Sequence, residues 1–178
     1  MIKRIINYIF NRFIPLEEQA RRAGVQIGED NFIASPFWSS EPYLIKIGSH
    51  CQITWGVKLL THGGGQVLRD KFPDFDTFGK VAIGDYVYIG TGSLILPGVT
   101  IEDNVLVAAG SVVTKSIPKG CVVAGNPARF ICTIDEYREK NEQFNLKSKK
   151  MSSLDKKDFL LKTNTGKFIS KGYINTYK

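Results

Sequence analysis

The sequence predicts an all-β fold, a parallel β-helix made of short strands and turns. From residue 83 to residue 113 a large aliphatic residue recurs at every sixth position, and a second position, mostly valine or serine, follows four residues after each of them. A helix would need a period of 3.6 and a half-buried strand an alternation of two, whereas a period of six fits a short strand followed by a turn. The large positions are Ile83, Ile89, Ile95, Ile101, Val107 and Val113.

The same six-residue repeat is present earlier in the chain, with two interruptions near residues 35–44 and 63–80. Glycine follows several of the large residues, which suits tight turns because glycine tolerates unusual backbone dihedral angles. We therefore expect the β-helix to span residues 25–132, with a loop at 63–80. The earlier large positions are Ile27, Ile33, Ile47, Ile53 and Leu59.

Helical segments are expected on both sides of the β-helix. Apolar residues from Ile2 to Phe13 recur at helical spacing, and Pro15 opens a second segment, Leu16 to Ala23, which Gly24 ends. We expect residues 1–24 to form a helical cap, because the end of a solenoid needs covering. A membrane-surface anchor is the less favoured alternative for this segment.

Residues 133–178 are expected to form a C-terminal helix, which Asp135 can cap, and a lysine-rich tail. Residues 140–178 hold ten lysines and three acidic residues, so they carry 10 − 3 = +7, the whole net charge of the chain. Such a tail could contact nucleic acid, an anionic membrane or an acidic glycan, but lysine-rich termini more often only solvate the chain. We expect no nucleic-acid partner and do not favour peripheral membrane contact.

Composition excludes several protein classes. A chain of 178 residues that is 43% hydrophobic is long and apolar enough for a real core, which argues against disorder. Cys51, Cys121 and Cys132 are an odd, widely spaced set, which argues against a disulfide framework and favours a reducing compartment. We recognise no signal peptide and no membrane span, and expect a cytoplasmic protein.

His62 is the candidate catalytic residue. It stands in Thr61-His62-Gly63-Gly64, at the end of a hexad and at the start of the longer insertion. A lone histidine is more often structural, but a neutral imidazole near pH 7 is suited to removing a proton from a hydroxyl group.

The interrupted hexads resemble those of the left-handed β-helix acyltransferases, the hexapeptide-repeat family, in which three hexads complete one coil. The segment around His62 resembles the Thr-His-Asp-Gly segment of the sugar-modifying branch, in which the histidine is the general base. The resemblance implies left-handed winding and direct acetyl transfer from acetyl-CoA. Gly63 stands where many such relatives carry aspartate; if that carboxylate orients the imidazole or binds the acceptor, another group has to do so here. The nearby candidates are Asp70, Asp74 and Asp76.

The stretch that ends in Asn126-Pro127-Ala128-Arg129 resembles the coenzyme A-binding end of the family. The resemblance implies that Thr91 and Ala109 meet the pantetheine arm through their backbone. It also implies that Thr114 and Lys115 flank the adenosine end, and that Arg129 pairs with phosphate. A lysine and an arginine suit a polyanionic ligand.

Other residues have two alternative roles. The backbone N–H groups of Gly90, Gly92 and Gly110 could stabilise an oxyanion or simply form turns. The three phenylalanines of the loop could grip a sugar or pin the loop to a neighbouring subunit, and Trp38 and Trp55 are similarly open. These phenylalanines are Phe72, Phe75 and Phe78.

The leading function is an acetyl-CoA-dependent O-acetyltransferase that acts on a sugar, such as a polysaccharide unit or its precursor. N-acetylation of an amino-sugar nucleotide and a non-catalytic scaffold are the alternatives. A zinc hydratase of related fold needs three histidine ligands, whereas this chain has only His50 and His62, so we expect no metal. The resemblance also implies a homotrimer with sites at subunit boundaries.

Overall fold

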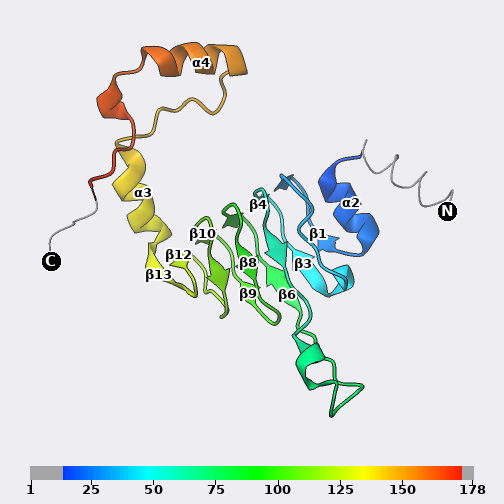
Figure 1. Ribbon diagram of the computed structural model, residues 1–178. Helices are drawn as coiled ribbons and strands as arrows, with labels where there is room; N and C mark the ends of the chain where they lie inside the picture. Colours follow the sequence, from blue (N-terminus) through cyan, green and yellow to red (C-terminus); the bar gives the residue numbers. More distant parts are fainter. Residues whose placement is uncertain (1–13, 174–178) are drawn as a thin grey trace, which may run out of the picture. The chain divides into compact units, whose positions relative to one another are not determined.

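Short parallel strands wind into stacked coils in the first part of the chain (Figure 1). The structure is a computed structural model that describes residues 14–173, so the helix expected between Ile2 and Phe13 lies outside the described residues. The chain divides into two compact units, with the boundary between Ile134 and Asp135. All the strands belong to the first unit.

Three sheets form the sides of the coils, and every strand pair is parallel except β12–β13. The first sheet contains β1 (Gln26–Ile27), β3 (Ile45–Ile47), β6 (Val81–Ile83) and β9 (Thr100–Ile101). The second contains β2 (Phe32–Ile33), β4 (Gln52–Ile53), β7 (Tyr88–Ile89), β10 (Leu106–Val107), β12 (Cys121–Gly125) and β13 (Ala128–Thr133). The third contains β5 (Lys58–Leu59), β8 (Leu94–Ile95) and β11 (Val112–Val113).

The register of the strands confirms the six-residue repeat. Ile83 pairs with Ile101, so one coil takes 101 − 83 = 18 residues, or three hexads. All six large positions from Ile83 to Val113 are buried in one aliphatic core, and the small positions Ser93 and Ser111 are fully buried. Each coil therefore adds one layer to a continuous hydrophobic column.

Glycine is favoured at the corner between the second and third sheets, which we call the second corner. Gly56, Gly92 and Gly110 occupy equivalent places there with φ of 74°, 70° and 69°. Only glycine adopts this left-handed region without steric cost. The corner between the third and first sheets, the third corner, begins with Thr61 and His62 and carries the loop 63–80.

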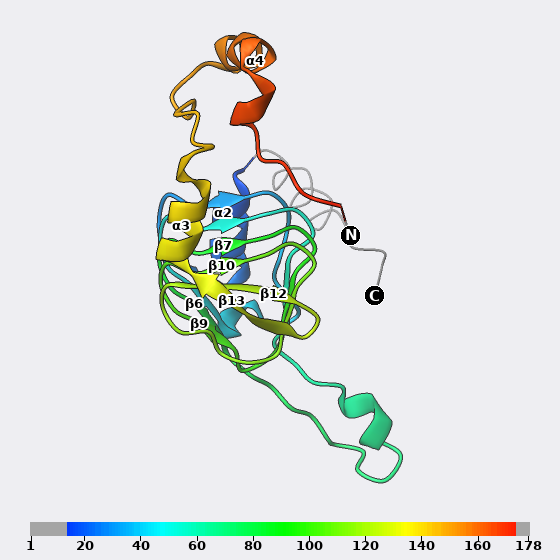
Figure 2. The same ribbon diagram turned by 90° about the vertical axis from the view of Figure 1, so that its left-hand side faces the viewer.

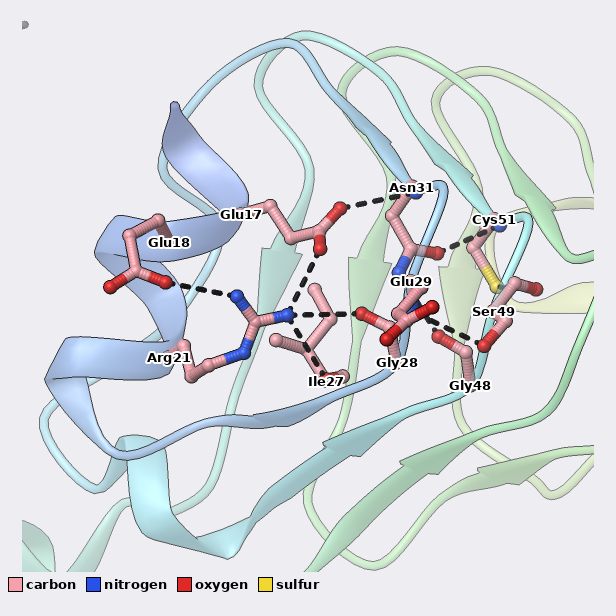
Figure 3. A network of polar contacts seen from close by, with 10 residues as sticks. All are labelled: Glu17, Glu18, Arg21, Ile27, Gly28, Glu29, Asn31, Gly48, Ser49 and Cys51. Carbon is pink, nitrogen blue, oxygen red and sulfur yellow. Dashed lines mark hydrogen bonds and ion pairs between the residues drawn. The ribbon is translucent and has the colours of Figure 1, made fainter. Parts of the chain in front are cut away.

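Helix α2 (Leu16–Ala23) lies at the first coil, and Gly24 ends it with φ of 110°. The guanidinium of Arg21 binds the carboxylates of Glu17 and Glu18 and also donates to the carbonyl oxygens of Ile27 and Gly28 (Figure 3). One side chain thus links the helix to strand β1 and the turn after it.

The loop after His62 includes the 3₁₀ helix η2 (Gly65–Leu68) and extends away from the coils in both views (Figures 1 and 2). The earlier insertion includes η1 (Pro42–Leu44). After β13 the chain forms α3 (Ile134–Glu142), α4 (Ser153–Lys162) and η3 (Thr165–Lys167). Within residues 14–173 no helix is long and apolar enough to span a membrane.

Candidate active site

His62 follows strand β5 at the third corner, where its backbone pairs with Phe78 on the returning arm of the loop. Its side chain is 45% exposed, and its Nδ1 lies 3.0 Å from Oε2 of Glu41. The imidazole is therefore both anchored through one nitrogen and accessible to a ligand.

The carboxylate of Glu41 is shared by two donors. The Thr61 hydroxyl donates to the same Oε2 at 2.7 Å. The bond from Thr61, followed by that from His62, lowers the pKa of Glu41 below its ordinary value. An ionised carboxylate only accepts hydrogen bonds, so in the neutral imidazole the hydrogen lies on Nδ1 of His62 and Nε2 is the acceptor.

Glu41 was missed in the sequence, where Asp70, Asp74 and Asp76 were the expected partners of His62. For the orientation of the imidazole this expectation is wrong among the described residues: the carboxylate that contacts His62 belongs to Glu41, whereas Asp76 lies 3.7 Å from Arg69. All three aspartates belong to the loop that projects from the third corner (Figure 2), and Asp76 lines the cavity beside His62.

The solenoid register explains how Glu41 reaches His62. Trp38 pairs with Leu59 as a parallel bridge, an offset of 59 − 38 = 21 residues. The same offset separates Glu41 from His62, because 62 − 41 = 21. The first insertion thus follows the path of a coil up to the third corner, and an alignment of Trp38 with the hexad position of Leu59 would have found Glu41.

A cavity of about 320 Å³ adjoins the pair. Its other lining residues come mostly from the loop and, apart from Phe78, are polar or glycine. An added Cβ at Gly64 would meet no atom within 4 Å, whereas one at Gly65 would collide with the carbonyl oxygen of Phe75. Of the three loop phenylalanines, Phe78 lines this cavity. The remaining lining residues are Ser40, Gly63, Gln66, Arg69 and Asp76.

Three of the residues expected to bind coenzyme A line a second cavity, of about 620 Å³, at the last coil. They are Thr114, Lys115 and Arg129, beside apolar side chains that include Val123 and Phe130. Among the described residues, neither Lys115 nor Arg129 forms an ion pair with a carboxylate. Both charges are available for an anionic ligand.

Thr91 and Ala109 lie at the second corner, outside that cavity. They occupy neighbouring coils, where the N–H of Gly110 donates to the carbonyl oxygen of Thr91. In the part of the chain that is described, the N–H groups of Thr91 and Ala109 donate to no other backbone group. Trp55 precedes them in the same column with 67% exposure, whereas Trp38 packs against the core and Phe37.

Of the two roles left open for the glycine N–H groups, the structure favours turn formation. The N–H groups of Gly90, Gly92 and Gly110 donate to carbonyl oxygens of Val107, Trp55 and Thr91. Turn geometry is therefore their role. An added Cβ at Gly92 or Gly110 would meet nothing within 4 Å, so the wall is open at these two positions.

The candidate residues flank the third sheet. His62 and Lys115 lie on its third-corner side, two coils apart, and Thr91 and Ala109 lie on its second-corner side. The cavity beside His62 and the cavity beside Lys115 share no lining residue.

His50 belongs to neither site: it stacks on Tyr86 and faces Asp30 at the remaining corner. Within residues 14–173 no group of three His, Cys, Asp or Glu side chains is arranged to hold a metal ion.

Comparison with known proteins connects this arrangement to one family. Residues 80–115 match the sequence profile of the bacterial transferase hexapeptide (six repeats). The protein CapG of Staphylococcus aureus is 46% identical over 149 residues, which cover 82% of this chain and 87% of that protein. The galactoside O-acetyltransferase of Escherichia coli is 31% identical over 79% of this chain and 81% of its own length.

A solved structure agrees with these sequence relationships. A galactoside acetyltransferase in complex with coenzyme A is 27% identical, with a TM-score of 0.51, over 74% of this chain and 78% of that chain. The hexad register, the profile match and relatives that cover most of the chain all lead to one conclusion: this chain belongs to the hexapeptide-repeat acetyltransferases.

Proposed function

We propose that this acetyltransferase moves the acetyl group of acetyl-CoA to a hydroxyl group of a sugar, such as a polysaccharide unit or its precursor. The observation that carries the proposal is the Glu41–His62 contact at the edge of a polar cavity. A cavity rimmed by amide, guanidinium, hydroxyl and carboxylate groups suits a ligand with many hydroxyl groups.

His62 acts as the general base. With its Nδ1–H bound to Glu41, its Nε2 can accept the proton of the acceptor hydroxyl. The imidazolium that forms is then stabilised by the adjacent carboxylate, which Thr61 keeps ionised and in place. Because the base and its positioning residue come from successive coils, their geometry is set by the rigid solenoid.

Acetyl-CoA supplies the activated acyl group as a thioester. An extended arm that carries amides fits the wall at the second corner. This wall is open at Gly92 and Gly110, and the N–H groups of Thr91 and Ala109 are free there. Lys115 and Thr114, with Arg129, fit the phosphate-bearing end.

We further propose a homotrimer. In one chain the cavity of His62 and the cavity of Lys115 are separate. A neighbouring copy laid against the third sheet would bring the base of one subunit to the cofactor residues of another. The family resemblance also implies that the coils are left-handed.

The test is coenzyme A release from acetyl-CoA with a panel of sugars, sugar nucleotides and short oligosaccharides, followed by analysis of the product linkage. An alkali-labile ester that His62→Ala abolishes supports the proposal. A stable amide would replace it with amino-sugar N-acetylation. An acetylated sugar formed equally by wild type and His62→Ala would overturn the role of His62.

A further inference from the structure

Beyond acetyl transfer, we infer that the second unit binds the surface of an anionic lipid bilayer. The surface concerned is the basic apolar segment, defined as residues 147–173. It contains eight lysines and two acidic residues, Asp155 and Asp158, so its charge is 8 − 2 = +6. The sequence alone does not favour a membrane partner. The exposed apolar side chains of the basic apolar segment do favour one.

The basic apolar segment exposes large apolar side chains among its lysines. Leu154 and Leu161 of α4 are 78% and 75% exposed, and they stand seven residues apart, on one side of the helix. Ile169 is 57% exposed and Tyr173 is fully exposed. Large apolar side chains left in water along one short segment are more than the scattered single residues of an ordinary surface, and they indicate an interaction surface.

The lysines of this segment are free to meet an external anion. Among residues 14–173, none of the ion pairs formed involves a lysine of the basic apolar segment. Near an anionic bilayer each such lysine strengthens binding about fivefold. Their stems can also lie along the apolar boundary while the ammonium groups remain hydrated.

A bilayer accounts for both the free lysines and the exposed apolar side chains, whereas the other polyanions account for the lysines alone. An acidic glycan or a nucleic acid would match the lysines but leave Leu154 and Leu161 in water. A second copy of the segment would cover the leucines but bring two charges of +6 together. At the boundary between headgroups and acyl chains, apolar side chains enter the hydrocarbon and lysines meet lipid phosphates.

The test is co-sedimentation of the full chain with vesicles of phosphatidylcholine, with and without phosphatidylglycerol, at about 0.1 M and higher salt. We expect binding to the phosphatidylglycerol vesicles that weakens with salt. Lys156→Gln with Lys157→Gln should reduce the partition coefficient about 25-fold. The matched control, Lys46→Gln with Lys71→Gln, removes two charges from the first unit and should leave it unchanged.

Leu154→Ser with Leu161→Ser tests the apolar contribution at constant charge, and should also weaken binding at least tenfold. Both leucines are exposed, so this variant should fold like the wild type, and acetyl transfer to a free sugar should persist.

Equal binding to both kinds of vesicle would overturn the inference. A leucine variant that binds vesicles like the wild type would also overturn it. This holds even if that variant changes the oligomeric state, and even if it still binds hyaluronate, an acidic glycan, through its lysines.

Discussion

The contact between Glu41 and His62 can be tested by Glu41→Gln, which keeps the size of the side chain and removes its charge. The amide oxygen can still accept from Nδ1, so the imidazole keeps its tautomer. The imidazolium formed during proton transfer would then face a neutral amide 3.0 Å away in place of a carboxylate. Hydrogen bonds between charged groups are about twice as strong as neutral ones, so we expect kcat to fall about 10- to 100-fold.

The assay is steady-state release of coenzyme A at saturating acetyl-CoA, with Glu29→Gln as the control that removes a carboxylate from another corner. The KM for acetyl-CoA should not change, because Glu41 lies outside the cavity of Lys115. A kcat for Glu41→Gln within about twofold of the wild type would refute the positioning role of Glu41.

Glu41→Gln should also change how the free energy of unfolding depends on pH. The pKa of Glu41 is lower in the folded chain than its ordinary value, because Thr61 and His62 donate to it. Its contribution to stability is therefore present above its ordinary pKa and lost as the pH falls through the lowered one. Urea unfolding at acidic pH should show a smaller loss of stability for Glu41→Gln than for the wild type.

Four further outcomes follow from the geometry. Gly64→Trp should fill the open side of the cavity beside His62 and raise the acceptor KM at least tenfold with little change in melting temperature, whereas Gly64→Ala should be nearly neutral. Arg21→Met should lower the melting temperature by about 2 to 4 °C, because Arg21 links α2 to the first coil, and Arg22→Met, which removes a contact to Glu18 alone, should lower it less. Burial raises the pKa of the Cys51 thiol, so iodoacetamide at pH 8 should label it only after unfolding, as peptide mass analysis would show. Lys115→Ala should raise the KM for acetyl-CoA about tenfold without changing kcat.

The repeat could be predicted because each hexad repeats one local rule: a large residue fills the interior and a small one fits beside it. That rule placed Ile83 to Val113 in the core without knowledge of long-range contacts. The position of His62 at the start of the loop could be predicted for the same reason.

Glu41 could not be found by this rule because it lies in an insertion that lacks the hexad pattern. Its place depends on the pairing of Trp38 with Leu59, a long-range contact in which an aromatic residue stands in for an aliphatic one. The catalytic and the turn-forming roles of the glycine N–H groups could not be separated in the sequence, because hydrogen bonds between coils are invisible there. The exposure of Leu154 and Leu161 likewise depends on how the second unit packs.

The most direct test of the central claim is the kcat of His62→Ala with a sugar acceptor that the wild type acetylates. A general base at Nε2 predicts a fall of about 10² to 10⁴, with an unchanged KM for acetyl-CoA and an unchanged melting temperature. A folded His62→Ala enzyme that acetylates the sugar at a near-normal rate would contradict the account.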